Sequence, residues 1–416
     1  MISRREFLGS SAALTAASLG GIDTSRATVA VASRRLITVF VRGGWDIAHS
    51  LDPKPELAAT PDYDDVTVFG DIPVLTSAAR PNIGGFFAEH GAMTSVVHCI
   101  DVRSIFHKVC TRKMFAGSPG GAGPDMGAIV ADEFARDYPM PYLIVGANGD
   151  KGPLGVISGR SGPSGQVNAL LEPADNFPRF QASTYFHDGF EASGSEQAAI
   201  EALLNARAAR ERATRGMHGA NAARVFDFAE SLLKGIALRD NAQYFGSIGQ
   251  ELDLSDQVEL ALTALERDLS WSVSITANLG FDTHDDNVQQ GQLQNGLFGG
   301  LSNLANELIA CDMIDDTVVV VFSEMSRTPA LNAAQGKDHQ PVTSAMVFGG
   351  GVAGRTAYGG NGDSVDALDV DFETGSTTEG ELRNLDSESW VAGVVALAGG
   401  DASLYLSADP FCAFIS

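Results

Sequence analysis

The residues of this sequence that could do chemistry lie in short polar groups behind apolar runs. The longest such run, Val318–Phe322, has no polar break and leads to Glu324 and Arg327. Asp338 and His339 follow after a short glycine-containing loop. Carboxylates and imidazoles bind divalent metals, and arginine holds anions, so this stretch predicts a site for a metal ion or a phosphate-like group.

A second group consists of Asp282 and His284, which follow the apolar run 272–279. They are two residues apart, and in extended backbone such residues point to the same face. That placement suits joint coordination of one cation. Two alternatives stay open: a carboxylate that only orients a histidine, and a solvated acidic loop, since Asp285 and Asp286 come next.

Two further polar groups follow apolar runs near the start of the chain. Asp46 comes after a Gly-Gly pair and is either a metal ligand or a helix N-cap. Ser104 is a candidate nucleophile, with Arg103 to hold an anion and His107 to bind metal or act as a base. In the alternative, Ser104 caps a helix and His107 is an ordinary residue of its first turn.

These groups can meet only if a sheet brings the ends of their strands together. An unbroken apolar run is typical of a strand buried on both faces, and ligands bind at the carboxyl ends of such strands. We predict an α/β fold with a mostly parallel central sheet, helices on both faces and one site. The predicted strands are 36–41, 94–99, 142–145, 272–279, 318–322 and 344–348, and the predicted helices are 82–91, 126–135, 292–309 and 390–397.

Three regions depart from this alternation. Residues 146–270 combine a Gly-, Pro- and Ser-rich stretch with Ala-rich helical patterns, which predicts an insertion and a helical excursion. Residues 355–388 are acidic and predict an exposed loop excursion, and residues 53–82 predict a surface loop. We assign 33–416 to a single domain.

The charge balance excludes some partners. The chain has 416 residues, 52 of them acidic and 28 basic, and a formal net charge of −24. Such a surface repels nucleic acid and anionic lipid, and no apolar run reaches the roughly 18 residues of a membrane span. Of the four cysteines, Cys99 and Cys110 are a candidate disulfide, but buried free thiols are the preferred interpretation.

Residues 1–32 are typical of a twin-arginine export signal. Ser3-Arg4-Arg5-Glu6-Phe7-Leu8 precedes a mildly apolar run, and Ala30-Val31-Ala32 offers a cleavage site. The signal predicts a periplasmic or extracellular protein that has the twin-arginine export machinery as a partner. Such substrates cross the membrane folded, so a metal could be bound before export.

The order of these motifs resembles a known family. The twin-arginine start, RGGWD, GFDTH, VVVFSEMSRTP and GKDH together resemble the bacterial family called domain of unknown function 1501, which is grouped with the alkaline phosphatase and sulfatase superfamily. The resemblance spans residues 35 to 400. It implies an alkaline phosphatase-like and sulfatase-like fold.

The resemblance also implies roles for individual residues. Asp46 resembles the aspartate after the first strand, and Ser104 the residue on the next strand-to-helix turn. The metal ligands that it implies are Asp282, His284 and His339, with Glu324 as a further carboxylate. Where the superfamily has an Asp-His pair, this chain has Glu324 and Met325, so one histidine is missing.

The implied activity is metal-dependent hydrolysis of phosphate or sulfate esters, small or on a glycan. Arg103 and Arg327 would neutralise the oxyanion, Ser104 or a metal-activated water would attack, and His107 or His339 would handle the proton. The metal would be zinc, calcium, magnesium or manganese. The alternative is a non-catalytic binding or assembly protein of the cell envelope on the same fold.

Overall fold

The computed structural model describes residues 32–54, 65–120, 123–146, 149, 152–161, 193–214, 218–241, 244 and 252–416. The predicted export signal and most of the Gly-rich part of the predicted insertion lie outside these residues. Every element below belongs to one unit, Ala32–Ser416.

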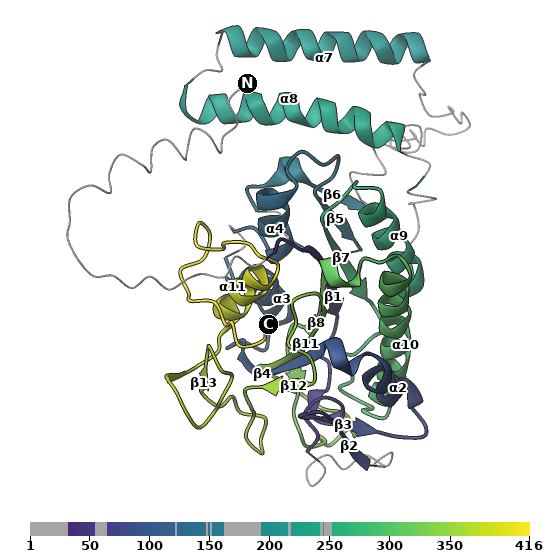
Figure 1. The fold of residues 1–416 in the computed structure, drawn as a ribbon, viewed down its shortest axis with the longest axis vertical. Coiled ribbons are helices and arrows are strands. Elements are labelled where there is room, and N and C mark those ends of the chain that lie inside the picture. The colour runs from purple at the N-terminus through teal and green to yellow at the C-terminus, as the bar shows by residue number, and fades with distance from the viewer. Residues whose placement is uncertain are drawn as a thin grey trace, which may run out of the picture. The chain divides into compact units, whose positions relative to one another are not determined.

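An eight-stranded sheet is the centre of the fold, in the order β12-β4-β11-β8-β1-β7-β5-β6 (Figure 1). Strand β11 runs antiparallel to both of its neighbours, β8 and β4. The other described strands of this sheet all run in one direction. The predicted mostly parallel α/β sheet is therefore confirmed. The strands are β1 (Arg35–Val41), β4 (Thr94–Asp101), β5 (Tyr142–Val145), β6 (Ser158–Ser161), β7 (Ser272–Ala277), β8 (Thr317–Ser323), β11 (Val342–Gly349) and β12 (Thr356–Tyr358).

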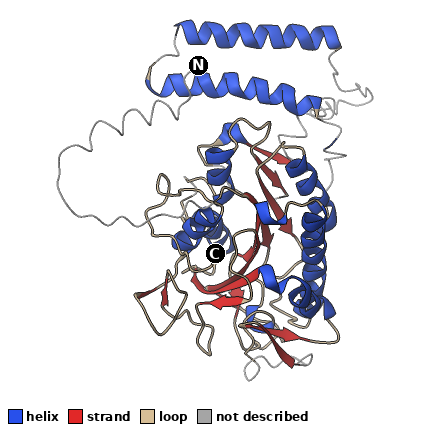
Figure 2. Cartoon of the chain, in the orientation of Figure 1, coloured by secondary structure: helices blue, strands red, loops and turns tan. Residues whose placement is uncertain are grey.

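Helices cover both faces of the sheet, as Figure 2 shows in blue and red. In β8, Val319 and Val321 pack into one core with α2 (Pro81–His90), α9 (Leu254–Glu266) and α10 (Gln289–Ala310). Val318, Val320 and Phe322 pack into the other core with α3 (His107–Ala116), α4 (Met126–Phe134) and α11 (Ser387–Leu397). Successive residues of a strand point to opposite faces, so a strand with two buried faces needs the unbroken apolar run that the sequence has.

Several regions differ from their sequence-based expectation. The expected surface loop contains a hairpin, β2 (Asp65–Phe69) and β3 (Ile72–Thr76), because apolar residues alternate on either side of a Gly-Asp turn. The acidic excursion contributes β12 to the edge of the sheet, together with a small pair, β13 (Val370–Asp371) and β14 (Leu382–Arg383). The helical excursion comprises α7 (Gly194–Thr214) and α8 (Gly219–Asp240), whereas α9 packs on β7 as part of the core.

Two other expectations concern cysteines and membranes. All four cysteines are free, so the candidate disulfide is not formed. The interpretation as buried free thiols is confirmed for Cys99 and Cys110, whereas Cys311 and Cys412 are only partly buried. None of the helices in the described ranges combines the length and the apolar character that a membrane crossing requires.

Candidate functional site

The candidate site lies where the carboxyl ends of β1, β4, β7 and β8 meet. Because β11 is antiparallel, the loop that precedes it arrives at the same edge. The turn after β1 is fixed by Gly43 and Gly44, at φ 115° and 93°. A Cβ on Gly43 would lie 2.7 Å from the Asp282 backbone nitrogen, so only glycine lets the turn approach the segment after β7 this closely.

Three ligand-type atoms from two loops form a small triangle. His284 Nε2 lies 3.0 Å from His339 Nε2, and each of these nitrogens lies 3.3 Å from Asp282 Oδ1. The structure thus brings together the Asp-His pair after β7 and the histidine before β11. Asp338 lies behind them, with Oδ1 3.3 Å from His284 Nδ1.

This triangle has the size of a metal-binding face. Ligand atoms of a tetrahedral zinc ion, at 2.0–2.1 Å from the metal, are about 3.3 Å apart. Two imidazoles and one carboxylate suit zinc or another first-row ion better than calcium or magnesium, which prefer oxygen ligands. His107, Asp282 and His339 form an overlapping group whose ligand atoms lie within 4.8 Å of one another. The donor set therefore fits a divalent metal.

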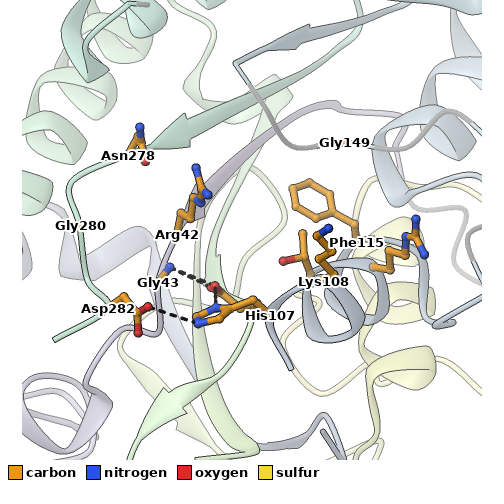
Figure 3. Close-up of a pocket in the computed structure, with 12 residues that line it drawn as sticks. Arg42, Gly43, His107, Lys108, Phe115, Gly149, Asn278, Gly280 and Asp282 are labelled. Carbon is orange, nitrogen blue, oxygen red and sulfur yellow. Dashed lines mark hydrogen bonds and ion pairs between the residues drawn. The ribbon is translucent and has the colours of Figure 1, made fainter. Parts of the chain in front are cut away.

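Glu324 lies behind His107 and is buried. Its Oε1 is 2.8 Å from His107 Nδ1, and its carboxylate also accepts hydrogen bonds from Gly43 N (3.0 Å) and Ser323 Oγ (2.9 Å). With Nδ1 held in this way, His107 directs Nε2 toward Asp282 Oδ2, at 3.5 Å (Figure 3). The sequence predicts that Glu324 is a metal ligand. In the structure its carboxylate lies where it can orient the His107 ring.

Arg327 is buried beneath Asp282. Its guanidinium donates to the carbonyls of Gly43, Gly44 and Lys337, and Nη2 lies 2.5 Å from Asp282 Oδ1. These contacts hold Asp282 in place and engage all three nitrogens of the guanidinium. The expected role of Arg327 in binding a substrate oxyanion stays a prediction.

The charges of the site favour the protonation states in which Asp282 and His339 can bind a metal ion. Partial burial raises the pKa of Asp282, but the Arg327 hydrogen bond and charge outweigh it and hold this pKa below its usual range. Burial lowers the pKa of His339, although Asp282 opposes the shift. The hydrogen bond to Glu324 raises the pKa of His107. Asp282 is thus ionised and His339 neutral at neutral pH, the forms that bind metal.

Asp46 lies in a buried ion pair. Its Oδ2 is 2.7 Å from Lys337 Nζ and accepts a hydrogen bond from Asn287 at 3.0 Å, and the side chains of Asp46 and Lys337 are both 0% exposed. Its Oδ1 has no hydrogen-bond partner among the described residues, so the prediction that Asp46 binds metal would fall on that atom. Asp46 is also the residue before a short 3₁₀ helix (Ile47–His49), without a side-chain cap hydrogen bond.

Burial of His49, next to this ion pair, predicts that the free energy of unfolding decreases in acid. Burial and the Arg80 charge lower the pKa of His49 from 6.5 to about 4. Between these pH values the unfolded chain binds a proton at His49 that the folded chain does not. Stability therefore falls as pH drops through this window, by about 3 kcal/mol from this residue alone.

Urea unfolding at pH 7 and pH 4.5 checks this expectation. We expect His49→Gln to lose less stability than the parent protein between the two values, since His90 and His98 are common to both. Equal losses in the two proteins would contradict the assignment.

Ser104 and Arg103 lie in the turn that follows β4, and both bond to residues in or beside that turn. Ser104 Oγ accepts a hydrogen bond from Phe106 N at 3.2 Å, and the described lining of the pocket does not include Ser104. Arg103 pairs with Asp101 at 3.3 Å and bonds to Asn384. Their catalytic roles stay predictions.

A pocket of about 730 Å³ opens beside the triangle. His107, Asp282 and Glu324 lie in its lining, and Figure 3 shows Lys108 and Phe115 on the α3 side, across from Asn278 and Asp282. Sequence reasoning missed Arg42, Lys108, Thr111 and Arg112. The signal was present: Lys108, Thr111, Arg112 and Phe115 have the spacing of one helix face.

Comparison with known proteins identifies a family. A family model described as "Protein of unknown function (DUF1501)" matches residues 33–371, which confirms the resemblance noted from the motifs. No curated protein matches this chain in sequence.

Three solved structures that resemble this chain are distant from it in sequence. Ps i-CgsB in complex with k-i-k-neocarrahexaose is 11% identical, with 91% of this chain and 75% of that chain covered, at a TM-score of 0.44. The lipoteichoic acid synthase LtaP from Listeria monocytogenes is 11% identical, with 79% and 68% covered, at 0.35. A TAB5 alkaline phosphatase mutant with Mg bound is 9% identical, with 79% and 95% covered, at 0.34.

Proposed function

The chain belongs to the DUF1501 family of proteins of unknown function, and on that premise we propose that it is an exported, metal-dependent hydrolase of phosphate or sulfate esters. The observation that carries the proposal is the triangle of Asp282 Oδ1, His284 Nε2 and His339 Nε2, with edges of 3.0 to 3.3 Å, beside an open pocket. The type of reaction follows the resemblance of the sequence motifs to the alkaline phosphatase and sulfatase superfamily.

Asp282, His284 and His339 would hold one divalent metal. When bound, the metal would supply positive charge against the anionic oxygens of the ester and favour attack by water. Asp338 positions His284 from behind, through the 3.3 Å contact with Nδ1. Arg327 does the same for Asp282 and keeps it ionised.

His107 is the proton donor in this proposal. Glu324 holds its Nδ1 and raises its pKa, so the imidazole carries a proton in a larger fraction of molecules at neutral pH. Water forms the new bond to phosphorus or sulfur, and the bond to the leaving oxygen breaks. His107 gives its proton to that oxygen, and the proton from water leaves through the open pocket to solvent.

The alternative is a non-catalytic binding protein of the cell envelope. Two observations favour it: Met325, which stands where the resemblance has a histidine, is fully buried, and the Ser104 hydroxyl bonds to its own turn. In this alternative the strand ends bind a structural ion or none.

Elemental analysis decides between the two. We expect the exported protein, purified without chelator or affinity metal, to contain about one equivalent of a first-row divalent metal, as the donor set fits. It should hydrolyse aryl phosphates or sulfates and lose that activity on dialysis against chelator. If the protein neither contains nor takes up metal, the proposed hydrolase is wrong. If it contains metal but hydrolyses neither class of ester, the binding protein is favoured.

A further inference from the structure

The face of α3 that lines the pocket is basic. Lys108, Thr111, Arg112 and Phe115 follow one another at helical spacing of three and four residues, and all four line the pocket. Arg42, at the end of β1, adds a third positive charge to the lining. We call Arg42, Lys108 and Arg112 the cationic wall.

The cationic wall has no acidic partner in the part of the chain that the structure describes. Nearby Arg103 does pair, with Asp101 at 3.3 Å, and the chain has 52 acidic residues for 28 basic ones. In such a composition, three exposed cations that form no ion pair with the described residues are unexpected. An anion that enters the pocket is attracted by each of these charges.

The wall consists of other residues than the metal-type donors. Lysine and arginine are not metal ligands here, and the metal-type donors of the lining are His107, Asp282 and Glu324. A volume of about 730 Å³ exceeds what one phosphate or sulfate group needs and suits a ligand of disaccharide size. The pocket therefore has room for a second charged group beyond the scissile one.

We infer that the cationic wall binds a second anionic group of the substrate, so that the substrate is an ester with at least two anions. That the ligand is an ester rests on the proposed function, whereas the anion subsite itself rests on the three cations. A chain with a net charge of −24 repels polyanions over most of its surface, whereas in the lining of this pocket the three cations outnumber the two carboxylates, Asp282 and Glu324.

Two sulfonates that cannot be hydrolysed test the subsite without catalysis. Binding of naphthalene-2,6-disulfonate and naphthalene-2-sulfonate to the metal-loaded protein is measured by calorimetry at several salt concentrations. We expect the parent protein to prefer the disulfonate. The double variant Lys108→Gln/Arg112→Gln should weaken disulfonate binding by about 10- to 30-fold, since two exposed charges are removed, and should leave monosulfonate binding less affected.

The matched control removes the same charge elsewhere. Arg210→Gln/Arg212→Gln, on exposed positions of α7, should bind the disulfonate as the parent does. If the wall variant also binds it as the parent does, or if the control loses as much, the inference is wrong. Metal content is measured on the same samples. If the protein holds no metal but the wall variant still loses the preference for the disulfonate, the proposed hydrolase is wrong and the anion subsite is supported.

Discussion

Replacing His339 by alanine is expected to remove the metal from the protein while leaving its fold intact. His339 supplies one of three ligand atoms, and its ring is near the surface, so its loss leaves no buried charge behind. Loss of a group that only orients a ligand weakens metal binding by about 10- to 100-fold, and loss of a ligand should weaken it by at least as much. Elemental analysis after purification measures the result.

Two other histidine variants make this test specific. His284→Ala should lose metal as His339→Ala does, because its Nε2 completes the triangle. His218→Ala, an exposed residue at the start of α8, should keep the metal of the parent protein. Circular dichroism confirms that each variant is folded. Full metal occupancy in a folded His339→Ala protein would show that the triangle is not the metal site.

Replacing Lys337 by methionine is expected to cost about 3–5 kcal/mol of stability, because it leaves the Asp46 carboxylate buried without its counter-charge. Urea unfolding at pH 7 measures the loss. Lys54→Met, at a pair with Asp52 that keeps some contact with solvent, is the matched control and should cost about 1 kcal/mol or less.

The double variant Asp46→Asn/Lys337→Met separates the two roles of Asp46. Removing both charges of a buried pair is often close to neutral, so stability should largely return. If Asp46 is only an ion-pair partner, the double variant also keeps its metal. A stable double variant that has lost its metal would instead support the prediction that Asp46 is a ligand, and failure to recover stability would show that the ion pair is not the cause of the loss.

The sequence by itself determined the fold class and brought some of the polar residues to one edge of the sheet. The unbroken run Val318–Phe322 could only be buried on both faces, and this property fixes a sheet between two layers of helices. Strands that run the same way deliver their ends to one edge, so the order of the motifs alone placed Asp282 and His284 together with Glu324. These inferences succeed because the hydrophobic period is a local property of the chain, and because a helix between two strands favours their parallel pairing.

The tertiary structure decided which neighbour each polar residue has. Glu324 holds His107 from behind, and Asp46 pairs with Lys337, because the turn through Gly43 and Gly44 buries these carboxylates while the Asp282 side chain stays partly exposed. Sequence spacing cannot distinguish a ligand from the group that orients it, since both are polar residues at a strand end.

The cationic wall shows the same limit. Lys108 and Arg112 have the spacing of one helix face, but a basic helix face usually faces solvent or pairs with acids. Only the packing of α3 against β8 and α11, beside the ends of β1 and β7, turns that face into the lining of a pocket. Which face of a helix borders a cavity depends on contacts between residues far apart in the chain, and these are fixed by the tertiary structure alone.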